Sequence, residues 1–219
     1  MKRLTYTLSL ALICAAMACN DAATTTDESK PADTASRAAD SPATKQAPPM
    51  DSAAMAKAWE AYMTPGDVHA MLAKDNGTWT AEMTMWMTPG APPQKTTGTM
   101  TNKMILGGRY QQSSFKGTFM GQPFEGQGTL AYDNSKKSFI STWIDNMGTG
   151  LMVMEGKYDS ANKVINFTGK GTDPTTGQDC TMREVFRIVD DNTQVMEMYA
   201  TYPGASEYKS MEITFRRKK

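Results

Sequence analysis

The chain has 219 residues, and its 23 Lys and Arg side chains are balanced by 23 Asp and Glu side chains, so the formal net charge is zero. Proteins that bind nucleic acid through its phosphates usually present a basic face. The charge balance therefore argues against a nucleic-acid partner. The four basic residues that end the chain are explained more simply as the frayed end of a strand.

Residues 1–18 have the pattern of a signal peptide. Two basic residues precede an apolar run that is too short to span a bilayer. The end of the segment, Ala16-Met17-Ala18-Cys19, resembles the lipobox of bacterial lipoproteins, although that motif prefers Leu at the position of Ala16. The resemblance implies cleavage before Cys19 and acylation of this residue; the alternative is an ordinary secretory peptide. We expect an exported protein, anchored to a membrane in the periplasm or cell envelope through Cys19.

Residues 19–50 are rich in Ala, Thr, Ser, Asp and Pro and contain no aromatic side chain. This segment cannot bury enough apolar surface to offset the entropy lost on ordering, so we predict a disordered tether. With Cys14 removed and Cys19 acylated, Cys180 would be the only free thiol of the mature chain. One thiol excludes an internal disulfide.

Residues 51–76 are predicted to form one or two short helices. The first, residues 52–62, places three large apolar side chains at helical spacing on one face. Residues 64–66 (Thr-Pro-Gly) break this helix, and Asp67 is a suitable N-cap for a second one. Both helices are interpreted as lids or packing pieces on the main domain.

From Thr78 onward the periodicity of apolar residues changes to two, which indicates half-buried strands. One side of the first strand carries Trp79, Ala81, Met83, Met85 and Met87. Further strand-like runs cover residues 96–106, 109–119, 123–132, 138–146, 150–158, 164–171, 181–189, 194–202 and 208–217. Short turn sequences join them, so residues 77–219 predict an all-β domain: an antiparallel up-and-down barrel of about ten strands, with room for one small ligand.

The triplet Gly77-Thr78-Trp79, which opens the first strand, resembles the Gly-x-Trp signature of lipocalins. In that family the Trp packs at the closed end of the barrel against a basic side chain from the last strand. The resemblance implies a structural cluster of Trp79 with Arg217, which shares its strand face with Phe215; Arg216 is the second candidate for the basic partner.

A closer resemblance covers residues 65–217 and rests on six segments. These are Met87-Thr88-Pro89-Gly90-Ala91-Pro92-Pro93, Ile105-Leu106-Gly107-Gly108-Arg109, Pro123-Phe124-Glu125-Gly126, Trp143-Ile144-Asp145-Asn146-Met147, Met182-Arg183-Glu184 and Met196-Glu197-Met198-Tyr199. They are similar to the bacterial family labelled domain of unknown function 1579. The resemblance implies a lipocalin-like β-barrel that is often exported, and it supplies no activity, cofactor or catalytic residue.

Five strand residues are candidates for binding a ligand inside the barrel: Trp143, Asp145, Glu155, Arg183 and Tyr199. If their side chains face inward together, they form a polar floor that would orient a ligand. If they face outward, they are the polar positions that the outer wall of an antiparallel barrel requires.

Metal and nucleophile chemistry have little support in the sequence. His69 is the only histidine, and together with Cys180 it is too small a set for a tetrahedral zinc site or a catalytic triad. Methionines are numerous, and repeats such as Met83-x-Met85-x-Met87 could bind copper(I). The alternative is that these flexible side chains fill the core or line a cavity.

The leading hypothesis is therefore an exported, lipid-anchored barrel that binds a small, mainly apolar ligand without cofactor or metal. The alternative is a structural or protein-interaction module of the cell envelope. Two weaker hypotheses are a copper(I)-binding protein and an enzyme. The enzyme would need Asp145, Glu155 or Glu184 held in an apolar site with a raised pKa.

Overall fold

The computed structural model describes residues 51–219. The predicted signal peptide, residues 1–18, and the predicted tether, residues 19–50, lie outside the described residues.

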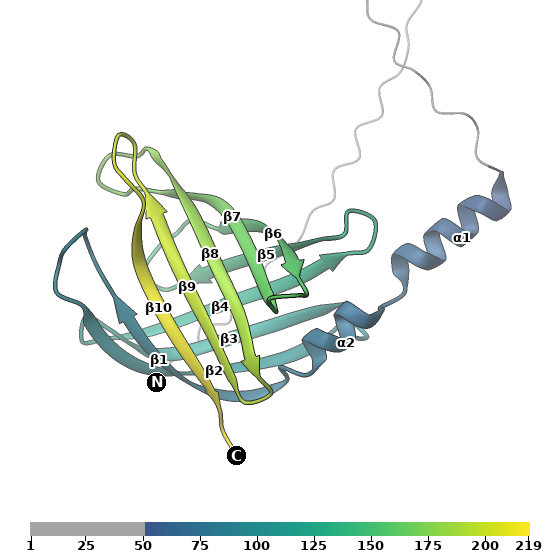
Figure 1. Ribbon diagram of the computed structural model, residues 1–219, viewed down its shortest axis with the longest axis horizontal. Helices are drawn as coiled ribbons and strands as arrows, with labels where there is room; N and C mark the ends of the chain where they lie inside the picture. The colour runs from purple at the N-terminus through teal and green to yellow at the C-terminus, as the bar shows by residue number, and fades with distance from the viewer. Residues whose placement is uncertain (1–50) are drawn as a thin grey trace, which may run out of the picture. The chain divides into compact units, whose positions relative to one another are not determined.

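Ten antiparallel strands form one closed barrel (Figure 1). They are β1 (Gly77–Met85), β2 (Gln94–Ile105), β3 (Tyr110–Phe119), β4 (Gln122–Asp133), β5 (Ser138–Asp145), β6 (Met152–Asp159), β7 (Val164–Thr172), β8 (Asp179–Asp190), β9 (Thr193–Thr201) and β10 (Tyr208–Arg217). Each strand pairs with its neighbours in sequence, and β1 pairs with β10 to close the barrel. The fold class predicted from the sequence is confirmed.

The hairpin turns explain why consecutive strands pair. In the turns after β4 and β6, Oδ1 of Asp133 and of Asp159 accepts two backbone N–H groups from the residues that follow. Each turn then closes with a lysine in the left-handed conformation, Lys137 and Lys163, both at φ 53°. These matching turns reverse the chain within a few residues, which leaves an antiparallel neighbour as the only partner within reach.

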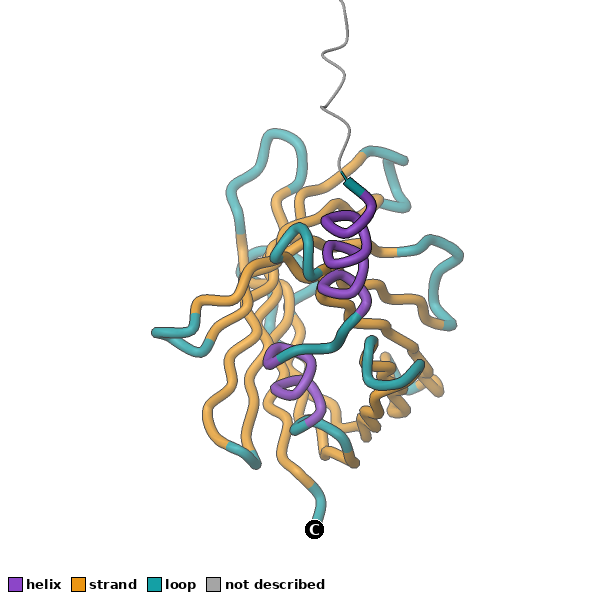
Figure 2. The backbone as a smooth tube through the Cα atoms, turned by 90° about the vertical axis from the view of Figure 1, so that its right-hand side faces the viewer, coloured by secondary structure: helices purple, strands orange, loops and turns teal. Residues whose placement is uncertain are grey.

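Two helices precede the barrel, α1 (Ser52–Met63) and α2 (Asp67–Ala73). Helix α2 lies against one end of the barrel, where Leu72 enters the core and is 2% exposed (Figure 2). Helix α1 buries no residue; its Trp59 is 56% exposed and touches Tyr62 edge to face. Neither described helix is long and apolar enough to cross a membrane.

The barrel core consists of two clusters of packed side chains. The first is built around Trp79, Phe115 and Phe215, and the second around Phe139 and Phe167. The alternation predicted for the first strand holds through β1, where the inward residues from Trp79 to Met85 are all buried. The Met side chains of the strands pack in these clusters, as the filler interpretation expects.

Candidate functional site

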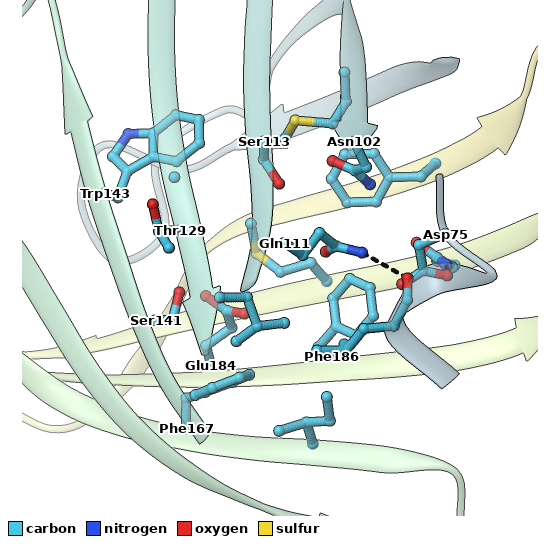
Figure 3. A pocket seen from close by; sticks show the side chains of 18 of the residues that line it. Asp75, Asn102, Gln111, Ser113, Thr129, Ser141, Trp143, Phe167, Glu184 and Phe186 are labelled. Carbon is cyan, nitrogen blue, oxygen red and sulfur yellow. Dashed lines mark hydrogen bonds between the residues drawn. The ribbon is translucent and has the colours of Figure 1, made fainter. Parts of the chain in front are cut away.

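A cavity of about 140 Å³ lies inside the barrel, bordered by members of both core clusters. Its wall is largely aromatic and aliphatic: Trp143, Phe167, Phe186, Phe215, Met100 and Met196. A few polar side chains interrupt this surface (Figure 3). An apolar enclosure with a small number of polar groups is the common form of a small-molecule site.

Trp143 on β5 forms the wall on one side, and two glycines of β4 make room for its ring. A Cβ atom at Gly126 would clash with the indole, and one at Gly128 would lie 3.2 Å from Cε3. The indole Nε1 donates a hydrogen bond of 3.0 Å to Oδ2 of Asp145. The ring is therefore held flat against β4, and the structure brings together two of the five predicted ligand residues, Trp143 and Asp145.

The end of the cavity beneath α2 carries a buried polar network. Gln111 on β3 donates from Nε2 to the backbone carbonyl of Leu72, 2.8 Å away. Gln194 on β9 donates from Nε2 to Oδ1 of Asp75, and both of these residues are buried. Burial raises the pKa of Asp75, while the bonds from the two glutamines and the charge of Arg217 act in the opposite direction. This network fixes α2 on the barrel.

Glu184 on β8 is the most unusual group in the cavity. Its neighbours in the strand register are Phe167 on β7 and Met198 on β9, so both flanking side chains are apolar. Burial raises the pKa of this carboxyl group to about 7, and no hydrogen-bond donor or cation among residues 51–219 offsets that burial. Glu184 is partly buried and lines the cavity. Glu184 is therefore an acid without a partner, aimed into an apolar space.

Asn102 on β2 is a second polar group without a partner. Its Oδ1 atom is buried and accepts no hydrogen bond from the described residues. Asn102 pairs in register with Ser113 on β3, and both side chains line the cavity. Figure 3 shows these two residues at one part of the cavity and Glu184 at another. Leaving a buried acceptor unpaired costs about 1–3 kcal/mol, so a donor that enters the cavity would recover this free energy.

Of the five predicted ligand residues, Trp143 alone lines the cavity; Asp145 accepts the bond from its indole without lining the cavity, and the remaining three lie away from it. Glu155 is exposed between the buried residues of β6, so it faces outward. Arg183 lies on the outer face of β8, where it forms a bidentate ion pair with Glu207, with Nη2 2.7 Å from Oε2. Its guanidinium stacks 3.8 Å from the ring centre of Tyr199, which is also on the outside. Glu155, Arg183 and Tyr199 thus take the outward one of the two orientations considered for the candidate residues, because strand alternation places them on the outer face of the barrel.

The predicted structural residues lie together at the α2 end of the barrel. Arg217 is paired in register with Trp79, and its guanidinium carbon lies 4.2 Å from the centre of the indole ring. Phe215 is buried in the same cluster. Gly77 adopts φ +127°, and a Cβ atom there would lie 3.2 Å from Nη1 of Arg217. A glycine is thus required at the first position of the triplet.

A second hollow, of about 330 Å³, lies where the link between α1 and α2 meets the barrel. It contains His69, which is buried and accepts a hydrogen bond at Nδ1 from the backbone N–H of Gly66. Burial, and then the charge of Arg109, lowers the pKa of His69. A neutral histidine that holds the start of α2 has a structural role. Within residues 51–219, no group of three His, Cys, Asp or Glu side chains is arranged to hold a metal ion.

Sequence reasoning missed the polar residues of the cavity other than Glu184, among them the amides Asn102, Gln111 and Gln194 and the hydroxyl residues Ser113, Thr129 and Ser141. The two-residue spacing of the strands could have identified two of them: Asn102 lies two positions from Met100 and from Met104, and Gln194 lies two positions from Met196. A polar residue in an apolar alternating series faces the core.

The fold and the site define a lipocalin-like barrel: ten antiparallel strands closed around one small, partly polar cavity. The chain belongs to the family described as "Protein of unknown function (DUF1579)", whose model matches residues 64–217. The family membership predicted from the six segments is confirmed.

The solved structures similar to this fold include the following two. Rv2717c from M. tuberculosis is 13% identical with a TM-score of 0.55, and the match covers 71% of this chain and 100% of that chain. The S-type phycobiliprotein lyase CPES from Guillardia theta is 11% identical with a TM-score of 0.51, and the match covers 74% and 97%. At these identities the likeness concerns the fold alone. No curated protein matches the chain.

Proposed function

We propose that the barrel binds a small, mainly apolar molecule in its interior cavity. The observation that carries this proposal is the cavity itself, with aromatic and Met side chains around a few polar groups. Its volume of about 140 Å³ suits a compact ligand, since an apolar cavity of about 150 Å³ in another protein binds benzene. A molecule built on one aromatic ring would fill it.

Binding fits the cavity better than catalysis does. Glu184 has the raised pKa that the acid–base hypothesis requires, to about 7. Its register neighbours Phe167 and Met198 carry no reactive group, however. Asp145, the second carboxylate of that hypothesis, is occupied by the indole of Trp143, and Glu155 faces outward. One acid without a nucleophile or base beside it supports recognition rather than turnover.

Isothermal calorimetry with toluene as the probe tests the proposal. Wild-type protein is expected to bind toluene at one site. The variant Ser141→Leu, which places a larger side chain in the cavity from β5, should lose at least tenfold in affinity. The matched control is Thr168→Leu, on the exposed face of β7, and it should bind as the wild type does. Equal affinity in all three proteins would refute binding in the interior.

We also propose that the protein is exported and held at a membrane by acylation of Cys19. The support comes from the sequence: the lipobox-like end of residues 1–18 and the tether-like composition of residues 19–50. Expression of the full chain and of Cys19→Ser, followed by membrane fractionation and intact mass of the mature protein, tests this. A mature Cys19→Ser protein that stays in the membrane fraction would contradict the lipid anchor.

The alternative function, an interaction module of the cell envelope, is favoured by one observation. Helix α1 leaves Met55, Trp59, Tyr62 and Met63 exposed on the surface. Aromatic residues on an open face are frequent in protein interfaces. Crosslinking in cells from a position on α1, compared with a position on the outer face of β7, would reveal a partner that depends on this helix. Identical crosslinks from both positions would reject it.

A further inference from the structure

We propose that the ligand of the interior cavity is a small arylalkylamine, bound as its ammonium form with the charge at Glu184 and the ring in the aromatic part of the cavity. This inference rests on the proposed function, because it names the chemical class of the molecule that the cavity receives.

The ionisable side chains of the cavity wall favour a cationic ligand. Asp75 and Glu184 are the only ionisable side chains that line the cavity, and no Lys, Arg or His of the described chain lines it. Asp75 is already engaged by Gln194. An anionic ligand would meet a carboxyl group with no cation to balance it, and an apolar ligand would leave Glu184 unpaired. A cation supplies the partner that a buried carboxylate requires.

Acceptors in the cavity that have no hydrogen-bond partner also favour a ligand that donates hydrogen bonds. Gln111 and Gln194 each donate one hydrogen bond from Nε2 in the network under α2. The hydroxyl groups of Ser113, Thr129 and Ser141 also line the cavity, and because a hydroxyl can donate or accept they favour neither kind of ligand. The Glu184 carboxyl group and Oδ1 of Asn102 have no donor among the described residues, and an ionised carboxylate and an amide oxygen both accept hydrogen bonds. A ligand that satisfies them must donate. A primary ammonium group offers three N–H donors on a single small atom.

The positions of the two groups define the shape of the ligand. Glu184 stands on β8 and Asn102 on β2, and in the closed barrel three strands separate them on one side and five on the other. The space between them is bordered by the rings of Phe167, Phe186 and Trp143. A cation beside Glu184 would also lie against Phe167 and Phe186, and aromatic faces attract cations. An ammonium group on an aromatic body fits this arrangement.

The ionisation of Glu184 adds a dependence on pH. Since its pKa is raised to about 7 in the protein without ligand, the carboxyl group is mostly ionised only above that pH. An alkylammonium group stays charged well above neutrality. The affinity for an ammonium ligand should therefore rise between about pH 6 and pH 8, while the affinity for an uncharged ligand of the same shape should not.

Calorimetry with four matched probes tests the inference: toluene, benzyl alcohol, benzylamine and benzoate, all at about pH 8. We expect benzylamine to bind about tenfold or more tightly than toluene, and benzoate to bind most weakly. In Glu184→Gln, which keeps the shape of the side chain, benzylamine should fall to within about threefold of toluene while toluene is unchanged. Glu155→Gln is the control, since Glu155 faces outward, and it should keep the preference.

The outcomes separate this inference from the proposed function. If no probe binds wild-type protein, the proposed function fails, and the ligand class fails with it. If toluene binds but benzylamine binds no more tightly, or if Glu184→Gln retains the preference, the ligand class is wrong and the binding function stands. Wild-type protein provides a second measurement that needs no variant: the ratio of benzylamine to toluene affinity should increase severalfold from about pH 6 to pH 8, and a constant ratio would overturn the assignment to Glu184.

Discussion

Arg217 covers the indole of Trp79, with its guanidinium carbon 4.2 Å from the ring centre, and it joins three parts of the chain at the α2 end of the barrel. Its nitrogens donate to the backbone carbonyls of Lys74, Asn76 and Asp191, at 2.6, 2.8 and 3.0 Å. The Trp79 indole N–H donates to the carbonyl of Asp75, 2.9 Å away. The two residues thus tie the end of α2 to β1, β10 and the turn after β8.

Trp79→Ala is expected to lower the free energy of unfolding by about 3–5 kcal/mol, because the indole is 1% exposed and its removal leaves a large void. Urea denaturation followed by circular dichroism measures this. Arg217→Lys retains the charge but loses the planar fork that reaches three carbonyls, so a smaller loss of about 1–3 kcal/mol is expected. An unchanged unfolding midpoint in Trp79→Ala would contradict the account of this end of the barrel.

Gly126→Ala should disturb the wall of the cavity. A Cβ atom at this position would clash with the Trp143 ring, and overpacking of this kind costs about 1–3 kcal/mol. The matched control is Gly148→Ala, where nothing lies within 4 Å of the new atom. The melting temperature and the affinity for toluene should both fall in Gly126→Ala and stay unchanged in Gly148→Ala. Equal melting temperatures and toluene affinities in the two variants would show that the position of the Trp143 ring does not require a glycine at position 126.

Glu184 makes stability depend on pH in a definite direction. Its pKa rises from 4.5 to about 7 on folding, so between these values the folded state binds more protons than the unfolded state. The free energy of unfolding therefore falls as the pH rises from about 4.5 to 7 and levels off above that. The contribution is on the order of 3 kcal/mol, at about 1.4 kcal/mol per pKa unit. Glu184→Gln should remove this part of the slope in urea denaturation measured over the same range; a slope equal to that of the wild type would exclude Glu184 as its source.

Arg183→Ala tests the placement of this residue on the outer wall. The ion pair with Glu207 is partly exposed, and such pairs contribute about 0–1 kcal/mol. We expect a small loss of stability and no change in the affinity for toluene or benzylamine. A tenfold loss of ligand affinity in this variant would mean that the side chain reaches the cavity.

The sequence predicted the fold closely because its strands alternate cleanly and its turns are distinct. The predicted run 208–217 coincides with β10, and the run 138–146 differs from β5 by one residue. Two-residue periodicity and Asp-rich turns are local properties, so they can be recognised without tertiary information.

The site was less predictable, because alternation does not show which face of a strand is inside when both faces carry apolar residues. On β8, Val185 and Phe186 are both partly buried, yet they belong to opposite faces. The choice between Arg183 and Glu184 as the inward residue therefore depends on the register with β7 and β9. That register is set by pairing around the whole barrel, which no local pattern contains.

The central claim, that a ligand occupies the barrel interior, is tested most directly by methyl NMR of protein labelled with ¹³C in its methionine methyl groups. Met71, Met100 and Met196 line the cavity, whereas Met120 and Met147 are exposed on turns. Titration with toluene should shift the methyl signals of the first three and leave the last two in place. Shifts confined to the exposed methionines, or no shifts at saturating toluene, would contradict the claim.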